Sequence, residues 1–257
     1  MLYRYRPAQR AESELREAVL WFSNWSQLND PFEFAPALSF RPEDHVGPRD
    51  KTNSEAYELA LMFAAVHVPE HHMNAYRAFT QNLGVCCFSK NPLNLLMWSH
   101  YADSHRGMGL GFDGDHTFFE EKELPADAIP NRRDIAYVDA RQKVELRDLR
   151  TAESIAQVTF TKPRAWAYEE EVRLVHQIYP GKQTLKFPLD ALREVIVGHR
   201  SQKAAVLRLR EDLASQAPHV KWRLAYLDPE RLGVTLMPLP IYKDLGGGSE
   251  MILPGAD

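Results

Sequence analysis

Cysteine is scarce in this sequence, and its two copies, Cys86 and Cys87, are adjacent. Neighbouring cysteines rarely bridge, because a disulfide requires a backbone separation and side-chain directions that adjacent residues seldom reach. The chain therefore has no disulfide framework, which excludes a small secreted scaffold held together by such bonds. We expect a reducing, cytoplasmic setting.

Long apolar runs and an excess of positive charge are also missing. No window approaches the roughly 20 apolar residues that a membrane helix needs. The first residues, "MLYRYRPAQR", contain no apolar segment of the kind that a secretory signal requires. A formal net charge of -4 argues against a general affinity for polyanions, although a local basic site remains compatible with it. We expect no membrane partner.

Several catalytic signatures are absent as well. The sequence has no glycine-rich dinucleotide fingerprint, no phosphate-binding P-loop and no GxSxG nucleophile motif. Histidine is clustered in "HVPEHH", but we expect Pro69 to break the helix that would place His67 and His71 on one face. We therefore predict no metal site, since zinc sites use three or four well-spaced ligands.

What is present suits a single folded domain. The 257 residues are 44% hydrophobic and 26% charged, an ordinary composition for a globular protein. We predict one domain over residues 1–245 and a flexible, glycine-rich C-terminal tail over 246–257. Helices come early and strands are spread along the chain without regular alternation, which favours an α+β fold. The expected architecture is a bent or split, mostly antiparallel sheet with helices packed on it.

The pattern of apolar residues predicts the main elements. We expect helices over residues 11–24, 52–68, 75–83, 91–106, 151–162 and 201–217, the last of them capped by Ser201. We expect strands over residues 2–6, 84–89, 107–113, 135–140, 168–179, 193–198, 220–227 and 233–240. The last two strands should pair, because "DPER" between them is typical of a turn.

The segment "NPLNLLMWSHYADSHRGMGLGFD", residues 91–113, combines a helix capped by Asn91 with a strand that has glycine at every second position. The glycines, at 107, 109 and 111, leave one face of the strand bare, so another backbone or a ligand should approach it closely. One interpretation is tight packing of a helix on the sheet. The other is room for a flat ligand bordered by Trp98 or Tyr101.

Charged residues alternate in "KPRAWAYEEEVRLV", residues 162–175. On an extended chain Glu169, Glu171 and Arg173 share one face. They can form a solvated surface whose charges neutralise each other. Alternatively, Arg173 holds a carboxylate that binds a ribose hydroxyl or stabilises a developing positive charge.

Five blocks together resemble one bacterial family, the domain of unknown function 2971. They are "LYRYR", "FSNWSQLNDPFE", "CFS", "LMWSHYADSHRGMGLGFD" and "WAYEEEVRLV", and they cover residues 2 to about 175 in the family's order. The name of that family carries no activity, so this resemblance by itself implies no chemistry.

A more distant resemblance is to ADP-ribosyltransferases. An early strand with an arginine, a serine-bearing strand and a later Glu-x-Glu are similar to their Arg–Ser–Glu-x-Glu pattern. The resemblance implies an ADP-ribosyltransferase-like fold, in which Arg4 binds NAD, Ser89 lines the nicotinamide pocket and Glu171 is catalytic on the nicotinamide ribose. Cleavage of that glycosidic bond builds positive charge on the ribose, which a nearby carboxylate stabilises.

These observations lead to one expected function and two alternatives. The first is transfer of ADP-ribose from NAD, as substrate, to an unknown protein or nucleic-acid acceptor, in the manner of a bacterial toxin or anti-phage effector. The alternatives are a non-catalytic nucleotide- or RNA-binding module and a metal-dependent hydrolase or nuclease. For ADP-ribosyl transfer, we predict that two catalytic residues, Glu169 and Glu171, lie in one cleft with the residues that bind NAD. The predicted NAD-binding residues are Arg4, Ser89, Trp98, Tyr101 and Arg173.

Overall fold

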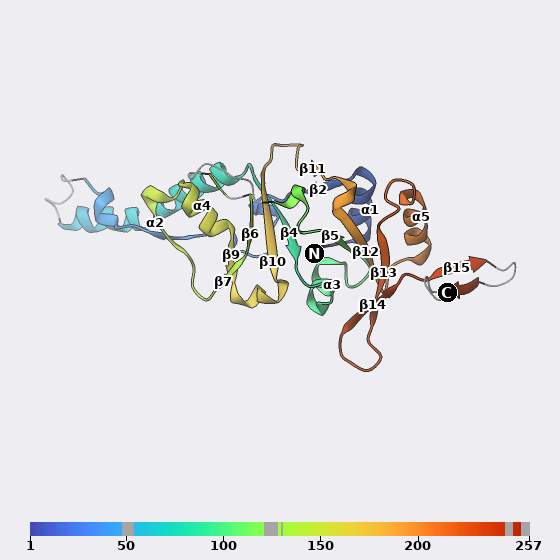
Figure 1. Ribbon diagram of the computed structural model, residues 1–257. Helices are drawn as coiled ribbons and strands as arrows, with labels where there is room; N and C mark the ends of the chain where they lie inside the picture. Colours follow the sequence, from blue (N-terminus) through green and yellow to red (C-terminus); the bar gives the residue numbers. More distant parts are fainter. Residues whose placement is uncertain (48–53, 121–127, 130, 245–248, 253–257) are drawn as a thin grey trace.

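A computed structural model describes residues 1–47, 54–120, 128–129, 131–244 and 249–252 of the chain. Its centre is an eight-stranded sheet whose neighbouring strands all run antiparallel, except for the parallel pair β12 and β13 (Figure 1). Across the sheet the order is β14 (Val234–Pro238), β13 (Lys221–Leu227), β12 (Leu192–Gly198), β5 (Met108–Phe112), β1 (Leu2–Arg6), β4 (Leu83–Ser89), β10 (Glu171–Gln177) and β6 (Arg132–Asp134). The expected mixture of helices with a large, mostly antiparallel sheet is confirmed.

Within the described residues, short strand pairs and five helices surround this sheet. The pairs are β2 (Val19–Trp21) with β11 (Thr184–Lys186), β3 (Ala37–Ser39) with β8 (Lys143–Glu145), β7 (Ala136–Val138) with β9 (Thr161–Pro163), and β15 (Ile241–Asp244) with β16 (Ser249–Ile252). The helices are α1 (Ala8–Glu17), α2 (Ser54–Thr80), α3 (Leu95–Tyr101), α4 (Ala152–Thr159) and α5 (Lys203–Leu213). Short 3-10 turns include η2 (Pro42–His45) and η6 (Arg164–Glu169). None of the helices in the described residues has the length and apolar character that a membrane span requires.

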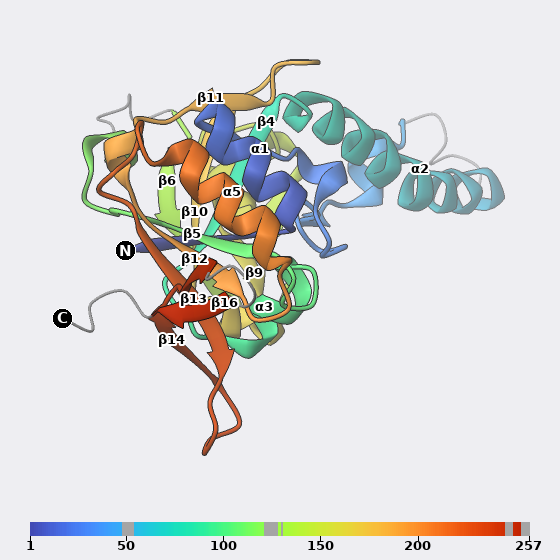
Figure 2. The same cartoon turned by 90° about the vertical axis from the view of Figure 1, so that its right-hand side faces the viewer.

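The sheet separates two apolar layers. Helices α1 and α5 cover one face, where Leu15 and Leu209 join Leu110 in the largest core cluster (Figure 2). Helix α3 covers the other face, where the fully buried Trp98 packs among Tyr3 and Tyr5. Because side chains alternate along a strand, neighbouring residues of β1 serve different cores.

The bare glycine face of β5 is filled by the protein itself. A Cβ built on Gly109 would lie 3.6 Å from the Trp98 ring, and one on Gly111 would lie 3.1 Å from Tyr3 and 2.7 Å from Glu194. Of the two interpretations, close packing of a helix on the sheet is therefore the correct one. The expectation that a flat ligand uses this face is wrong, because α3 and β1 occupy the space.

The sheet is split between β1 and β4. Strand β1 has five registered pairs with β5, but only Tyr3 and Ser89 are in register between β1 and β4. Beyond that pair β4 turns to another partner, since Val85 bridges to Ser23. The split leaves room between the two strands, and residues of both strands line a pocket there.

Two helix boundaries differ from the sequence prediction. Helix α1 ends at Glu17 because Ala18 adopts a left-handed conformation, with φ of 50°. The next residues, Val19–Trp21, form strand β2 against β11 instead of continuing the helix. Helix α2 runs through Pro69, which we expected to break it, so His67 and His71 do share one continuous helix. A proline removes one helical hydrogen bond, and here the 27-residue helix stays continuous despite that missing bond.

Two caps also differ, because the residues expected to cap have other partners. Asn94, not Asn91, accepts the first backbone N–H groups of α3. The Asn91 amide instead donates to Glu170 at 3.0 Å. Helix α5 follows Gln202, because the Ser201 hydroxyl donates to the backbone oxygen of Arg106 at 2.7 Å. Pairing of β13 with β14 is confirmed.

The expected C-terminal tail contains a strand. Within residues 246–257, Ser249–Ile252 pairs with Ile241–Asp244 in antiparallel register. Residues 246–248 and 253–257 lie outside the described part of the chain. The single domain over residues 1–245 stays a prediction.

Gly198, the last residue of β12, should tolerate no side chain. A Cβ there would lie 2.2 Å from the backbone oxygen of His105, which cannot give way as a flexible side chain could. We expect Gly198→Ala to lower the free energy of unfolding by about 1–3 kcal/mol, the range for overpacking a well-filled core. Gly233→Ala is the matched control, because nothing lies within 4 Å of its Cβ position. Urea denaturation of both variants checks this, and equal midpoints would contradict it.

Candidate functional site

A pocket of about 210 Å³ opens where β1 and β4 part. Residues from seven segments line it, among them β1, β4, α3 and β10. Five of the seven residues predicted from the sequence are at its wall, namely Arg4, Ser89, Tyr101, Glu169 and Glu171. They are separated by up to 167 positions in the chain, so the fold, and not the sequence neighbourhood, brings them together.

Strand pairing explains how the arginine, serine and glutamate blocks meet. Ser89 pairs with Tyr3 of β1 on one side and with Glu171 of β10 on the other. The three blocks therefore lie on three adjacent strands, in the order in which they occur along the chain. Ser89 is fully buried at the edge of the pocket, where its hydroxyl accepts a hydrogen bond from the backbone N–H of Asn91 at 3.1 Å.

The guanidinium group of Arg4 is already occupied. Its nitrogens donate to Glu14 at 3.0 and 3.1 Å, to the Cys86 sulfur at 2.8 Å and to the Trp21 backbone oxygen at 2.7 Å. Arg4 therefore joins α1 and β2 to the split sheet. Arg6, two residues further on, lines the same pocket, and its Nε is buried with no hydrogen-bond partner among the described residues.

An ion-pair cluster forms the acidic wall of the pocket, and Lys162 lies at its centre. The Lys162 ammonium is 2.6 Å from Glu169, 3.1 Å from Glu171 and 3.2 Å from Glu33. Arg173 contacts the same carboxylates from behind, at 2.8 Å from Glu171 and 2.9 Å from Glu33. Three carboxylates thus face two cations, and no side chain of the five is more than 4% exposed.

The two glutamates of the Glu-x-Glu motif differ in their titration. Burial opposes ionisation of Glu171, but the adjacent Arg173 and Lys162 outweigh it and lower its pKa from 4.5 to about 2. Burial dominates at Glu169 and raises its pKa, although Lys162 acts in the opposite direction. Glu171 is therefore held ionised, and Glu169 is the carboxyl that more readily takes up a proton.

Tyr101 connects α3 to this cluster. Its hydroxyl donates to Glu169 at 2.5 Å and accepts a hydrogen bond from the Asn29 amide at 3.0 Å. Burial, followed by the charge of Glu169, raises the pKa of Tyr101. The phenol therefore stays neutral and fixes the direction of the Glu169 carboxylate.

Trp98 and Arg173 do not reach the pocket. Trp98 is fully buried, packs edge-on against Tyr5 at 5.1 Å and donates its ring N–H to the Pro92 backbone oxygen at 2.9 Å. Arg173 is also fully buried and lies behind Glu171, with its third contact to the Thr159 backbone oxygen at 2.6 Å. Both residues therefore position groups of the pocket wall instead of lining it.

The backbone brings Glu169 close to Glu171 in a way that differs from the prediction. We expected both on one face of a strand, but β10 begins only at Glu171 and Glu169 ends the turn η6. Glu170 between them adopts a left-handed conformation, with φ of 46°, which redirects the chain. The two carboxylates then converge because both pair with Lys162.

Sequence reasoning missed three residues of this site, namely Glu33, Lys162 and Arg6. Glu33 lies in the turn over residues 31–34, and Lys162 lies in the short strand β9. Neither has a spacing that relates it to Glu171, so only the folded chain connects them. The sequence does contain a signal that points to Arg6. It lies two residues after Arg4, and the alternation of side chains along a strand places both on one face of β1.

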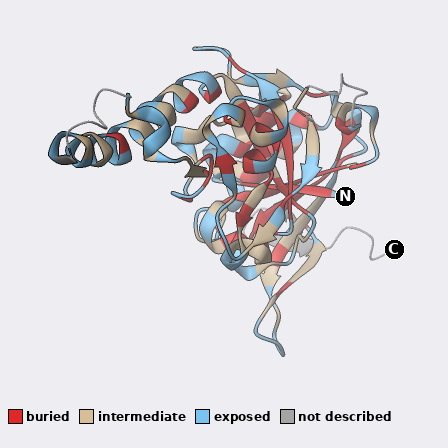
Figure 3. Ribbon diagram, turned by 90° about the vertical axis from the view of Figure 1, so that its left-hand side faces the viewer, coloured by how far each residue is buried: buried red, intermediate tan, exposed pale blue. Residues whose placement is uncertain are grey.

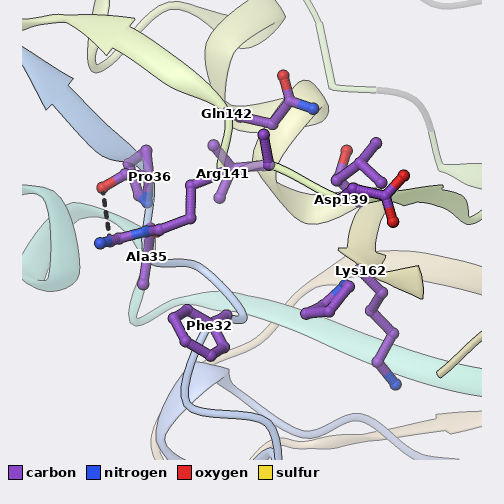
Figure 4. A pocket seen from close by; sticks show the side chains of 12 residues that line it. Phe32, Ala35, Pro36, Asp139, Arg141, Gln142 and Lys162 are labelled. Atoms are coloured by element: carbon purple, nitrogen blue, oxygen red, sulfur yellow. Dashed lines mark hydrogen bonds between the residues drawn. The ribbon is translucent and has the colours of Figure 1, made fainter. Parts of the chain in front are cut away.

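A second pocket, of about 160 Å³, adjoins the cluster (Figure 4). Lys162 lines both pockets, and Phe32, with 53% of its surface exposed, lines this one. Its polar side chains have protein partners: Arg141 donates to the Ala35 backbone oxygen at 2.8 Å, and Asp139 pairs with Arg164 at 2.9 Å. The first pocket, with the excess carboxylate of its ion cluster, is the better candidate site.

No group of three or more histidine, cysteine or acidic side chains could hold a metal ion within the part of the chain that the structure describes.

Residues 97–174 match the model of a family described as "Protein of unknown function (DUF2971)". This segment carries Tyr101, Lys162 and both catalytic candidates, whereas Arg4 and Ser89 lie outside it. No curated protein and no solved structure matches the chain. The resemblance to ADP-ribosyltransferases gains no support from these comparisons.

Proposed function

We propose that this protein transfers ADP-ribose from NAD to a macromolecular acceptor in the pocket between β1, β4 and β10. The observation that carries the proposal is the Glu171 carboxylate, which is kept ionised in a buried pocket wall. A fixed negative charge in a site that excludes water stabilises developing positive charge far better than it would in water. The adjacent Arg–Ser–Glu strands give the same pocket the residues of the expected pattern.

The transfer itself requires two changes at the ribose. The bond between C1′ and the nicotinamide nitrogen breaks, and its electron pair stays on that nitrogen, so neutral nicotinamide leaves. Positive charge develops on the ribose, where Glu171 stabilises it. A lone pair of the acceptor then forms the new bond to C1′, and the acceptor's proton passes to Glu169. Opposite pKa shifts on two neighbouring carboxyls suit this division of roles.

The charge of the ion cluster at the acidic wall favours a cationic substrate group there. With all groups ionised, Glu33, Glu169 and Glu171 exceed Lys162 and Arg173 by one negative charge at this wall, whereas Arg4 and Arg6 exceed their partner Glu14 by one positive charge at the β1 wall. The nicotinamide ring of NAD is positively charged before transfer and neutral afterwards, so the pocket should hold the substrate more tightly than this product. Arg6 lines the opposite wall of the pocket, where its guanidinium group pairs with Glu14 at 2.8 Å.

Incubation of the purified protein with NAD should release nicotinamide, which chromatography measures. When the adenylate part of NAD carries a radioactive phosphate, the reaction should also label an acceptor in a cell extract. Glu230→Gln is the matched control, since Glu230 is exposed and lies in the turn after β13. It should release nicotinamide at the wild-type rate. If NAD binds in calorimetry but no nicotinamide appears at any protein concentration, the transfer proposal is wrong.

That outcome would favour the second candidate, a non-catalytic nucleotide- or RNA-binding module. One feature supports it: Lys162 pairs with all three carboxylates at once, and a saturated ion cluster can serve folding alone. In that case the same pocket would hold a nucleotide without bond cleavage.

A further inference from the structure

The second pocket lies where β7 and β9 meet the turn before β3 and the loop between β7 and β8 (Figure 4). Most of its wall is apolar. Phe32, Val138 and Val158 are the larger apolar side chains, and Pro36 and Pro163 add two rings that offer no backbone N–H. Such a wall favours a ligand group that needs few hydrogen bonds.

The volume of the second pocket corresponds to one aromatic ring. Its 160 Å³ are close to the roughly 150 Å³ of an apolar cavity that binds one benzene molecule. A nucleotide, with its base, sugar and phosphate, is several times larger than benzene and cannot be enclosed there. The size of the pocket therefore selects a single ring.

Phe32 gives the second pocket an exposed aromatic surface, since 53% of the residue is accessible to water. The guanidinium carbon of Arg141 lies 5.9 Å from the centroid of its ring and holds the ring in place. A ligand ring that packs on Phe32 removes this apolar surface from water. Two aromatic rings also attract each other beyond the effect of burial, which a saturated ring of the same size does not match.

The charges that line the second pocket, taken with their ion-pair partners, sum to zero. Arg141 contributes one positive charge, and the exposed pair of Asp139 with Arg164 contributes none. Lys162 belongs to the ion cluster, whose three carboxylates exceed its two cations by one negative charge. This balance favours an uncharged ring, because burying a charge without a partner is costly.

The uncharged polar side chains of the wall have partners within the protein. The Gln157 amide donates to the side-chain oxygen of Gln142, and the Thr161 hydroxyl donates to the backbone oxygen of Gln157. A ligand therefore gains little from a hydrogen-bonding group directed at them, and contact with the apolar wall decides its affinity.

We propose that the second pocket is a binding site for an uncharged, single-ring aromatic group, which packs on Phe32 and lies beside Lys162 (Figure 4). The ring belongs either to a free compound or to a tyrosine side chain of a protein partner, and both sources share the same chemistry. The probe for the first source is p-cresol. The probe for the second is a tripeptide of glycine, tyrosine and glycine with both ends capped.

A methyl NMR titration of the full chain with p-cresol tests the proposal. The methyl signals of Val138 and Val158 should shift through the ring current of the ligand, with a dissociation constant of about 1 mM or below. Methylcyclohexanol, the saturated ring of the same size, should bind at least roughly 5-fold more weakly. A tripeptide that binds at least as tightly as p-cresol identifies a protein side chain as the source, and weaker binding identifies a free compound.

Phe32→Ala should weaken the binding of p-cresol by roughly 5- to 10-fold, because the ligand loses its aromatic neighbour. The fold should survive, since Phe32 is exposed. Phe79→Ala is the matched control, at a phenylalanine that is 54% exposed and does not line the pocket, so it should bind p-cresol as the wild type does. Phe79 lies near the end of helix α2, most of which is coloured as exposed or intermediate in Figure 3.

Four results would overturn the proposal. They are no shift of the Val138 and Val158 signals, methylcyclohexanol binding as tightly as p-cresol, wild-type affinity in Phe32→Ala, and shifts that appear instead at Val85 of the first pocket. The titration contains no NAD, so its outcome does not depend on ADP-ribosyl transfer.

Discussion

Glu171→Gln should lower the turnover of ADP-ribosyl transfer by roughly 100- to 1,000-fold, the usual effect of losing one well-placed electrostatic contact in a transition state. The substitution keeps the shape of the side chain and removes its charge. Affinity for NAD should change much less, because the ribose carries less positive charge in the ground state than in the transition state. Single-turnover release of nicotinamide, together with calorimetric binding of NAD, separates the two quantities.

The same variant should also lose stability, and the structure shows why. Glu171 lies between Arg173 at 2.8 Å and Lys162 at 3.1 Å, with 2% of its side chain exposed. Removing its charge breaks the buried ion pairs with Arg173 and Lys162, which typically costs about 3–5 kcal/mol. Turnover must therefore be measured below the melting temperature and per folded molecule, with circular dichroism giving the folded fraction.

Two control variants show whether the loss is specific. Glu230→Gln changes an exposed carboxylate, and Glu194→Gln changes a buried one that accepts a hydrogen bond from Tyr3 at 3.0 Å. Neither removes a carboxylate of the ion cluster, so turnover per folded molecule should stay close to that of the wild type. A Glu171→Gln protein that melts early, yet whose folded fraction keeps full activity, would make Glu171 a structural residue only.

Local patterns in the sequence predicted the sheet well. The alternation of apolar residues with glycine gave β5, and the alternation in "EVRLVHQ" gave β10 and the shared face of Glu171 and Arg173. Such predictions work because a strand repeats every two residues whatever surrounds it. The same logic fails at Glu169, since one left-handed residue, Glu170, ends the alternation.

Contacts between distant parts of the chain could not be predicted in this way. Lys162 and Glu33 are 129 positions apart, and only the folded chain brings them within 3.2 Å. Arg4 illustrates a related limit. Its motif was recognisable, but its hydrogen-bond partners Glu14 and Cys86 depend on how α1 and β4 pack around the split sheet. A pattern can thus identify a residue without showing whether its side chain is free to bind a ligand.

Arg173→Met should destabilise the fold by about 3–5 kcal/mol at neutral pH, because it leaves carboxylates buried without their cation. Arg173 is fully buried and is within 2.9 Å of both Glu171 and Glu33. It also donates to the Thr159 backbone oxygen at 2.6 Å, which methionine cannot replace. Denaturant midpoints at pH 7 measure this loss. Arg193→Met is the matched control: Arg193 pairs with Asp113 at 2.7 Å on the surface, where the midpoint should hardly move.

The pH dependence of the stability of Arg173→Met shows whether the charge of Glu171 accounts for the expected loss. The pKa of Glu171 falls from 4.5 to about 2 in the folded protein, so its ion pairs stabilise the fold above pH 4.5. That contribution is lost as the pH falls from 4.5 towards 2, because the unfolded chain takes up the proton first. Without Arg173 the pKa of Glu171 should rise, and the variant should lose less stability in acid than the wild type. The difference in unfolding free energy between the two proteins should therefore narrow from pH 7 to pH 3. A difference that stays constant over this range would mean that Arg173 stabilises the fold through packing and its bond to Thr159, and not through the charge of Glu171.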